Sequence, residues 1–335
     1  MKRPHSISRR GFLTSACAAA GLGIVAVPPP LIAQTPALDS AMGRIPANRV
    51  GVQIYTLRNL LDEHMLGFEG AFELLQDIGV TNVELAGLFM GQTPAELRKM
   101  AARYGIDIAG NHFGPRTMDG ANPWYDAAGR AAIFADARAL GLEFVGTGHY
   151  YNVPLTVDGF RQFAQTLNVW GKAASEVGLK FYYHNHDGEF ARYNGRPIFD
   201  ILLEETDPEH VHFELDLAWA AIAGEDIYEF VPRHQHRFPL FHVKDFWFVD
   251  DGPRETKPNT LAAGNRFTFA DVGKGTIDWP RLLSGLENPS RHLYFIERDD
   301  AGVDRPAEGS PKPTNPAGPV NTVWSSFRYL TELEY

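Results

Sequence analysis

Short apolar runs rich in Val, Ile, Phe and Tyr recur along the chain from residue 50 onwards, and they predict eight β-strands. The runs are Val50–Tyr55, Thr81–Leu85, Ile106–Ala109, Phe144–Gly146, Lys180–Tyr183, Val211–Leu215, Leu240–Val243 and Leu293–Ile296. The segments between them carry apolar residues at helical spacing. They predict helices at Gly67–Ile78, Pro94–Tyr104, Ala127–Leu140, Val157–Val177 and Phe199–Glu205, with a closing helix at Val320–Leu333.

The number of strand and helix units decides the fold class. Eight units in about 250 residues are typical of a closed (β/α)8 TIM barrel. No convincing glycine-rich dinucleotide fingerprint follows the first predicted strand, which argues against a Rossmann fold. We therefore expect a single-domain α/β TIM barrel over residues 49–335. Two segments rich in Gly, Pro and Asp, Trp247–Asp278 and Asp299–Pro319, are predicted to be irregular loops over the catalytic mouth.

The first 33 residues predict a twin-arginine signal peptide. A basic start leads into Ser8-Arg9-Arg10-Gly11-Phe12-Leu13, and a small, apolar run follows as far as a plausible cleavage site near Ala33. The alternative, a buried helix, is disfavoured because the run has no helix caps. We expect residues 1–33 to engage the twin-arginine export machinery and residues 34–48 to form a linker. The mature protein would then be periplasmic or otherwise exported, and soluble after signal cleavage.

Charge and cysteine content narrow the chemistry. The chain has 31 basic and 41 acidic residues, a formal net charge of -10, which argues against a nucleic-acid partner. Removal of residues 1–33 takes away four basic residues and no acidic one, so the charge of the mature chain becomes -14. The only cysteine, Cys17, lies in the predicted signal peptide. Any metal site in the barrel must therefore use His, Asp and Glu.

Polar residues lie at or just beyond the C-terminal end of every predicted strand, where the active sites of TIM barrels lie. They are Gln53, Tyr55, Arg58, Glu84, Asn111, His112, His149, Tyr150, His184, His186, Asp187, Glu189, Glu214, Asp216, His242, Lys244, Asp245 and Glu297. His, Asp, His and Glu from four consecutive strands suit one divalent cation with mixed nitrogen and oxygen ligands. Mn²⁺ is the preferred ion, with Co, Zn, Fe and Mg as alternatives.

Several of these residues also have a structural interpretation. Glu84 could form a salt bridge with Arg58, and Asp245 could cap the turn that follows it. His234 and His236 lie in a polar run and are expected to be solvated rather than metal-binding. The aromatic residues Trp219, Trp247 and Phe248 suit either stacking on a sugar ring or covering the barrel.

Seven motifs together resemble the sugar phosphate isomerase/epimerase superfamily, which has a xylose isomerase-like TIM barrel. The motifs are Gln53-Ile54-Tyr55-Thr56-Leu57-Arg58, Val83-Glu84-Leu85, His184-Asn185-His186, Glu214-Leu215-Asp216, His242-Val243-Lys244-Asp245, Val272-Gly273-Lys274-Gly275-Thr276-Ile277-Asp278-Trp279 and Phe295-Ile296-Glu297. The resemblance implies one divalent metal ion held by Asp216, His242 and Glu297 and by a fourth ligand from strand five. In the fifth strand, His184 stands where many relatives have Glu. This departure resembles the His-rich strand of inosose dehydratase. Either His184 replaces that carboxylate, or Glu189 reaches the metal from the loop.

The same resemblance implies a carbohydrate substrate and proton abstraction next to a carbonyl group. Candidate bases are Glu189, His186 and Glu297, and Lys244 would stabilise an oxyanion or assist the leaving group. The substrate-binding candidates are Gln53, Glu84, His112, His149 and Trp219. Loss of the strand-five Glu favours elimination from a keto-sugar or 3-keto-glycoside over epimerisation, because the epimerases exchange the proton through two glutamates.

Other functions stay open at this point. The protein could be an epimerase or isomerase of unphosphorylated sugars, or a non-catalytic carbohydrate-binding protein. A nuclease related to the apurinic endonuclease branch of the superfamily is disfavoured by the acidic charge of the mature chain. The sequence leaves monomer and homo-oligomer both open.

Overall fold

The computed structural model of the protein describes residues 43–62, 64–87, 89–114, 122–150, 153–154, 156–193, 196–249, 267–301 and 317–335. Residues 42–335 form one compact unit. The predicted signal peptide and the predicted linker up to residue 42 lie outside the described residues. Within the described ranges, no helix has the length and apolar character needed to cross a membrane.

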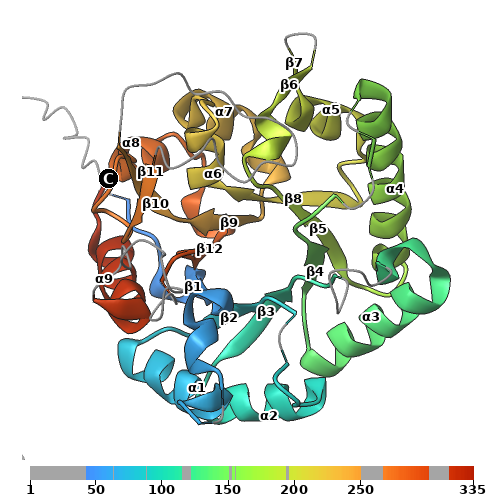
Figure 1. The fold of residues 1–335 in the computed structure, drawn as a ribbon. Coiled ribbons are helices and arrows are strands. Elements are labelled where there is room, and N and C mark those ends of the chain that lie inside the picture. The colour runs from blue at the N-terminus through green and yellow to red at the C-terminus, as the bar shows by residue number, and fades with distance from the viewer. Residues whose placement is uncertain are drawn as a thin grey trace, which may run out of the picture. The chain divides into compact units, whose positions relative to one another are not determined.

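Eight parallel strands form the wall of a barrel (Figure 1). In wall order they are β3 (Asp107–Asn111), β2 (Asn82–Leu85), β1 (Val50–Gln53), β12 (Leu293–Ile296), β9 (Leu240–Val243), β8 (Val211–Asp216), β5 (Lys180–His184) and β4 (Phe144–Thr147). The wall closes between β3 and β4, where His112 and Gly146 form a parallel bridge and the Phe113 N–H donates to the Gly146 carbonyl at 2.7 Å. The predicted TIM barrel is confirmed.

Helices surround the barrel on its outer side (Figure 1). They are α1 (Gly67–Ile78), α2 (Pro94–Arg103), α3 (Ala127–Leu140), α4 (Val157–Ser175), α5 (Ile198–Glu205), α6 (Leu217–Ile222), α7 (Ile227–His234), α8 (Trp279–Ser284) and α9 (Gly318–Glu332). Helix α1 ends at Gly79 and α3 at Gly141, both with the left-handed backbone that glycine adopts without steric cost. The Thr93 hydroxyl and the Glu96 carboxylate form a reciprocal capping box at the start of α2.

Alternate residues of the strands point into the barrel, and at its N-terminal end they form an apolar floor. The floor residues are Phe144, Tyr182, Leu240, Leu293 and Phe295. A Cβ at Gly51 would lie 2.8 Å from the Phe295 ring, and one at Gly146 would lie 2.7 Å from the Tyr182 ring. Two narrow positions in the wall therefore make room for two aromatic rings, and the charged residues lie above them.

Most predicted elements occur within one or two residues of their expected bounds, and the differences have local causes. Strand β1 stops at Gln53 because its side chain accepts the Tyr55 N–H at 3.2 Å and starts a 3-10 helix at Ile54–Leu60. Helix α6 was not predicted because it is short and almost wholly buried, so it lacks an amphipathic pattern. Helix α7 contains Pro232, which breaks the usual helix signal.

The segment after β9 is more ordered than predicted. Strands β10 (Asp245–Phe248) and β11 (Phe267–Ala270) pair antiparallel, although Trp247–Asp278 was expected to be irregular. The pairs Phe246 with Phe269 and Phe248 with Phe267 give this hairpin one aromatic face. A second, smaller hairpin joins β6 (Arg192–Tyr193) to β7 (Arg196–Pro197). Residues 250–266 and 302–316, within the two predicted loops, lie outside the described residues.

The last residues of the predicted linker pack against the end of the chain. Ile45 is buried in the core, and Gly43 and Tyr335 exchange backbone hydrogen bonds of 2.8 and 3.1 Å. Arg44 forms an ion pair with Glu334. From Gly43 onward the chain therefore belongs to the barrel unit.

Candidate metal centre and active site

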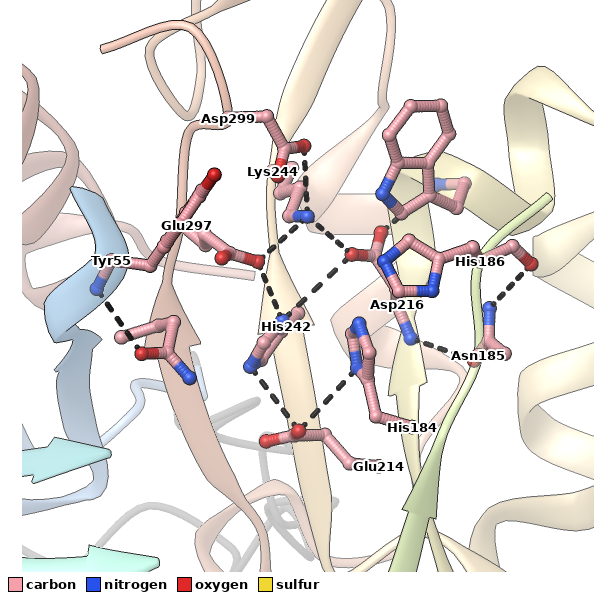
Figure 2. Close-up of polar contacts among 12 residues, drawn as sticks. Tyr55, His184, Asn185, His186, Glu214, Asp216, His242, Lys244, Glu297 and Asp299 are labelled. Carbon is pink, nitrogen blue, oxygen red and sulfur yellow. Dashed lines mark hydrogen bonds and ion pairs between the residues drawn. The ribbon is translucent and has the colours of Figure 1, made fainter. Parts of the chain in front are cut away.

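Four predicted metal ligands meet at the C-terminal ends of neighbouring strands (Figure 2). His184 ends β5, Asp216 ends β8, His242 is the third residue of β9, and Glu297 follows β12 directly. All four are buried, and one ligand atom from each lies within 4.8 Å of the other three. We call these residues the ligand quartet.

Local hydrogen bonds fix the direction of Asp216. Its Oδ1 accepts the Trp219 N–H at 2.9 Å and caps helix α6, which leaves Oδ2 turned toward the barrel axis. Its backbone N–H donates to Asn185 Oδ1 at 3.0 Å, so the loop after β5 is tied to β8. His242 Nδ1 lies 3.8 Å from Asp216 Oδ2 and 2.8 Å from Glu297 Oε2.

Three buried atoms of the ligand quartet make no hydrogen bond within the described part of the chain: His184 Nδ1, Asp216 Oδ2 and His242 Nδ1. Their near neighbours are charged groups instead: Asp216 Oδ2 faces the Lys244 ammonium at 2.8 Å, and His242 Nδ1 faces Glu297 Oε2 at 2.8 Å. Two imidazole nitrogens and two carboxylates are the donor set that Mn, Fe, Co and Zn accept in proteins. These residues therefore fit a divalent cation.

The ammonium group of Lys244 lies beside the quartet. Its Nζ is 2.8 Å from Asp216 Oδ2, 2.7 Å from Glu297 Oε2 and 3.0 Å from Asp299 Oδ2 (Figure 2). Burial alone would lower the pKa of Lys244, but the three carboxylates raise it well above its usual value. Burial would raise the pKa of Glu297, and Lys244 and His242 together hold it well below its usual range.

Glu84 lies below the quartet and is completely buried. Its carboxylate accepts hydrogen bonds from the Tyr182 hydroxyl and from Gln53 Nε2, the latter at 2.5 Å. His242 Nε2 is 2.7 Å and His112 Nε2 is 3.3 Å from its oxygens. Burial alone would raise the pKa of Glu84, but the two imidazoles hold it well below its usual value. Gln53 and Glu84, predicted to bind substrate, are thus placed in a buried layer beneath the mouth.

His184 and His242 also belong to a second group of possible ligands, which consists of His112, His184, Glu214 and His242. A neutral imidazole has only one nitrogen lone pair, so His242 can serve one group at a time. Its Nε2 faces Glu84 at 2.7 Å and Glu214 at 3.2 Å, and both carboxylates favour a proton on that nitrogen. Nδ1 is then the nitrogen that would bind a cation, in place of the proton that Glu297 favours there at 2.8 Å, and this arrangement favours the ligand quartet.

His112 lies at the upper edge of this buried layer and is partly exposed. Its Nε2 is 2.8 Å from Glu214 Oε2, and its ring is stacked against that of His242 at 5.6 Å. Burial would lower the pKa of His112, but Glu84 and Glu214 raise it to about 9. The predicted substrate-binding residue His112 is therefore held as a cation by two carboxylates.

His186 and Trp219 lie beside the quartet on the side of β5 and β8. The His186 ring stacks on His149 with 4.9 Å between centroids and lies 6.1 Å from the Trp219 ring. Lys244 Nζ lies 5.5 Å from the Trp219 ring, and Phe267 and Phe269 of the β10–β11 hairpin pack edge-on against that ring. These contacts bring the predicted residues His149, His186 and Trp219 together.

Glu189 points away from the barrel axis. Its carboxylate accepts hydrogen bonds from the Tyr183 hydroxyl at 2.6 Å and from the His186 N–H at 3.0 Å. Tyr183 alternates with the inward Tyr182 and His184 along β5 and packs against Phe163 of α4. In the described part of the chain Glu189 belongs to neither ligand group, and burial raises its pKa to about 8. Of the two alternatives for strand five, the geometry favours His184.

The alternative salt bridge between Glu84 and Arg58 is wrong. Arg58 donates instead to the carbonyl oxygens of Tyr55 at 2.8 Å and Asp299 at 2.7 Å. Asp245 has the structural role that its position suggested. It accepts the backbone N–H groups of Phe246, Gly273 and Ile277 and the Trp279 indole N–H, at 2.9 to 3.2 Å.

Sequence reasoning did not single out Tyr182 and Asp299. Both stand two residues from a member of the ligand quartet, since Tyr182 precedes His184 and Asp299 follows Glu297. Strand alternation places Tyr182 on the same side of β5 as His184, and this signal was available in the sequence. Asp299 lies in the turn that follows β12, so no strand periodicity indicates its position. Burial raises the pKa of Asp299 to about 6, against the opposing effect of Lys244.

Comparison with known proteins places the chain in a family. Residues 72–312 match the family described as xylose isomerase-like TIM barrel, over more than half of the chain. The chain belongs to this family.

Curated relatives of this xylose isomerase-like barrel include inosose dehydratases. The protein from Salmonella typhimurium is 25% identical over 270 residues, which cover 75% of this chain and 86% of the relative. The protein from Geobacillus thermodenitrificans is 30% identical over 145 residues, 42% of this chain and 48% of the relative, so that match spans about half of its length. A sugar phosphate isomerase/epimerase structure from Parabacteroides distasonis has a TM-score of 0.61 at 21% identity and covers 88% of this chain and 98% of its own. That structure supports the fold, and the dehydratases indicate an enzyme that acts on sugar-like molecules.

Proposed function

We propose that this protein is a divalent-metal-dependent lyase that acts on a keto-sugar or 3-keto-glycoside. The reaction removes the proton next to the carbonyl group and then breaks the carbon–oxygen bond β to that carbonyl. The observation that carries the proposal is the ligand quartet at the barrel mouth, whose four buried residues each offer one ligand atom within 4.8 Å of the other three. The dehydratase names of the curated relatives support elimination.

A bound divalent ion would polarise the carbonyl group and stabilise the negative charge that develops on its oxygen. His186 is half-buried beside the quartet, and we assign it the role of accepting the proton from the α-carbon. The electron pair released at that carbon forms the enediolate and then expels the β-oxygen substituent. Lys244 holds positive charge next to the quartet, where it stabilises the departing oxygen until that oxygen takes up a proton.

The carboxylates around the site favour elimination over a proton exchange between two glutamates. His184 occupies the end of β5, and the carboxylate of Glu189 is engaged by Tyr183 and the His186 backbone. Glu297 is therefore the one glutamate of the ligand quartet. We further propose, from residues 1–33 alone, that the protein is exported and meets unphosphorylated substrates.

Metal analysis tests the centre directly. We expect about one Mn, Co, Zn or Fe per chain in protein purified without chelators, and loss of this metal in Asp216→Ala and His242→Ala. His236→Ala and Asp158→Ala are matched controls, because both side chains are exposed away from the quartet. Absence of metal from the native protein, with none taken up on reconstitution, would overturn the proposal and favour a carbohydrate-binding protein.

Incubation of keto-sugars and 3-keto-glycosides in D2O tests the reaction. Release of the substituent, with loss of the α-hydrogen and formation of a double bond between the α- and β-carbons, supports elimination. Deuterium incorporation without release would instead show an epimerase or isomerase. Tight binding without either result would show a non-catalytic binding protein.

A further inference from the structure

Lys244 and the candidate metal position use the same two carboxylate oxygens. Lys244 Nζ lies 2.8 Å from Asp216 Oδ2 and 2.7 Å from Glu297 Oε2. Glu297 Oε2 also lies 2.8 Å from His242 Nδ1, and Asp216 Oδ2 is the oxygen that does not accept the capping hydrogen bond of α6. Figure 2 shows these contacts converging beside His242. An ammonium and a divalent ion at this place would draw on the same negative charge and repel each other.

Asp299 offers Lys244 a partner outside the ligand quartet. Its Oδ2 lies 3.0 Å from Lys244 Nζ, and its backbone carbonyl is held by Arg58 at 2.7 Å. Arg58 thereby anchors the residue that carries this third carboxylate. Lys244 can thus keep one charged contact while Asp216 and Glu297 serve another cation.

This inference rests on the proposed metal site. We infer that Lys244 is a built-in competitor for the divalent cation, and that Asp299 draws the Lys244 ammonium away from Asp216 and Glu297 when the cation binds. Lys244 and Asp299 would then act as positioning residues that set metal affinity in opposite directions. The ammonium also balances part of the charge of three clustered carboxylates, so it holds the quartet together at the same time as it weakens cation binding.

Metal affinity of the full chain, measured with Mn²⁺ and Co²⁺ against a chromophoric chelator, tests this relationship without reference to activity. We expect Lys244→Met to bind both ions about tenfold more tightly or better, because the competing charge is gone. Asp299→Asn should bind them about tenfold more weakly, because Lys244 then has only Asp216 and Glu297 as partners. Lys180→Met is the matched control, since Lys180 is exposed at the start of β5 and pairs with Glu143. Its affinity should equal that of the wild type.

The double variant Lys244→Met with Asp299→Asn separates this inference from a general loss of negative charge. If Asp299 acts through Lys244, the double variant binds metal as tightly as Lys244→Met alone. Weaker or unchanged binding in Lys244→Met would overturn the inference, as would strictly additive effects in the double variant. Lys244→Gln serves in place of Lys244→Met if the latter does not fold. Metal binding that is missing in the wild type as well would instead contradict the proposed function.

Discussion

Glu84 Oε2 lies 2.7 Å from His242 Nε2, on the side of the ring that faces away from Glu297. A buried carboxylate in this position accepts the proton of one ring nitrogen and leaves the lone pair on the other. The buried layer beneath the mouth therefore orients a candidate metal ligand, although the sequence suggested that Glu84 binds substrate.

The first prediction concerns this orientation. Glu84→Ala should weaken Co²⁺ or Mn²⁺ binding by about 10- to 100-fold, because His242 loses the acceptor that fixes its protonated nitrogen. Chelator competition measures the affinity. Tyr182→Phe removes only the hydroxyl that donates to Glu84 and should have a much smaller effect. Equal metal affinity in Glu84→Ala and wild type would show that Glu84 does not orient His242.

A second prediction concerns Glu189 and pH. Burial raises the pKa of Glu189 to about 8, and the neighbouring Asp187 adds to that shift, whereas hydrogen bonds from Tyr183 and the His186 N–H oppose it. In the unfolded chain this carboxyl ionises near pH 4.5, whereas in the folded protein it stays protonated up to about pH 8. Unfolding therefore releases a proton between these values, and folded-state stability falls as pH rises across this window.

Thermal melting from pH 5 to pH 9 checks this effect in wild type and Glu189→Gln. The variant lacks the titrating group, so its melting temperature should fall less steeply than that of the wild type over this range. At the alkaline end of this range, the pH-dependent loss in the free energy of unfolding should differ between the two proteins by on the order of a few kcal/mol. Parallel pH profiles for the two proteins would refute the prediction.

The third prediction concerns the loop that follows β9. Asp245 accepts four N–H groups and offers only acceptor atoms to them. Asp245→Asn places an NH2 group against donors, and we expect a loss of about 2–4 kcal/mol of unfolding free energy, measured with urea. Asp278→Asn is the matched control. Asp278 caps helix α8 through the Arg281 N–H, and Asn caps helices about equally well, so its stability should change little.

A fourth prediction concerns the proton acceptor. His186→Asn should lower kcat by about 10²- to 10⁴-fold, the usual contribution of a general base, while metal content stays at the wild-type value. His149→Asn removes the imidazole stacked on His186 and should affect KM more than kcat. A fully active His186→Asn protein would move the role of base to another residue.

The sequence was sufficient to predict the barrel because its signals are local. Helices α1 and α3 occur at their expected bounds, since an amphipathic face and a C-terminal glycine define each one. The β10–β11 hairpin was missed because residues 249–266 separate its strands, and no short turn motif joins them. Such long-range pairing depends on tertiary contacts, here of Phe267 and Phe269 with Trp219.

The depth of each site residue was harder to predict than its presence. Glu84 and Glu297 both stand at the end of a strand motif, yet Glu84 is the third residue of β2, whereas Glu297 follows the last residue of β12. The register between β2 and β3 also shifts between Val83 and Glu84. Because strands of a barrel are tilted and staggered, equal positions in the sequence reach unequal heights along the barrel axis. The ion pair between Lys244 and Asp299 likewise depends on the heights of these two residues along the barrel axis, which the sequence does not give.

The apolar floor of the barrel determines how ligands can enter and leave the site. Phe144, Tyr182, Leu240, Leu293 and Phe295 close the lumen below Glu84, so ligands reach the quartet from the mouth. In the proposed function, substrate, product and metal ion would therefore all pass through the same opening. A substrate bound there would cover the metal ion, and the metal ion would exchange with solvent only after that substrate had left.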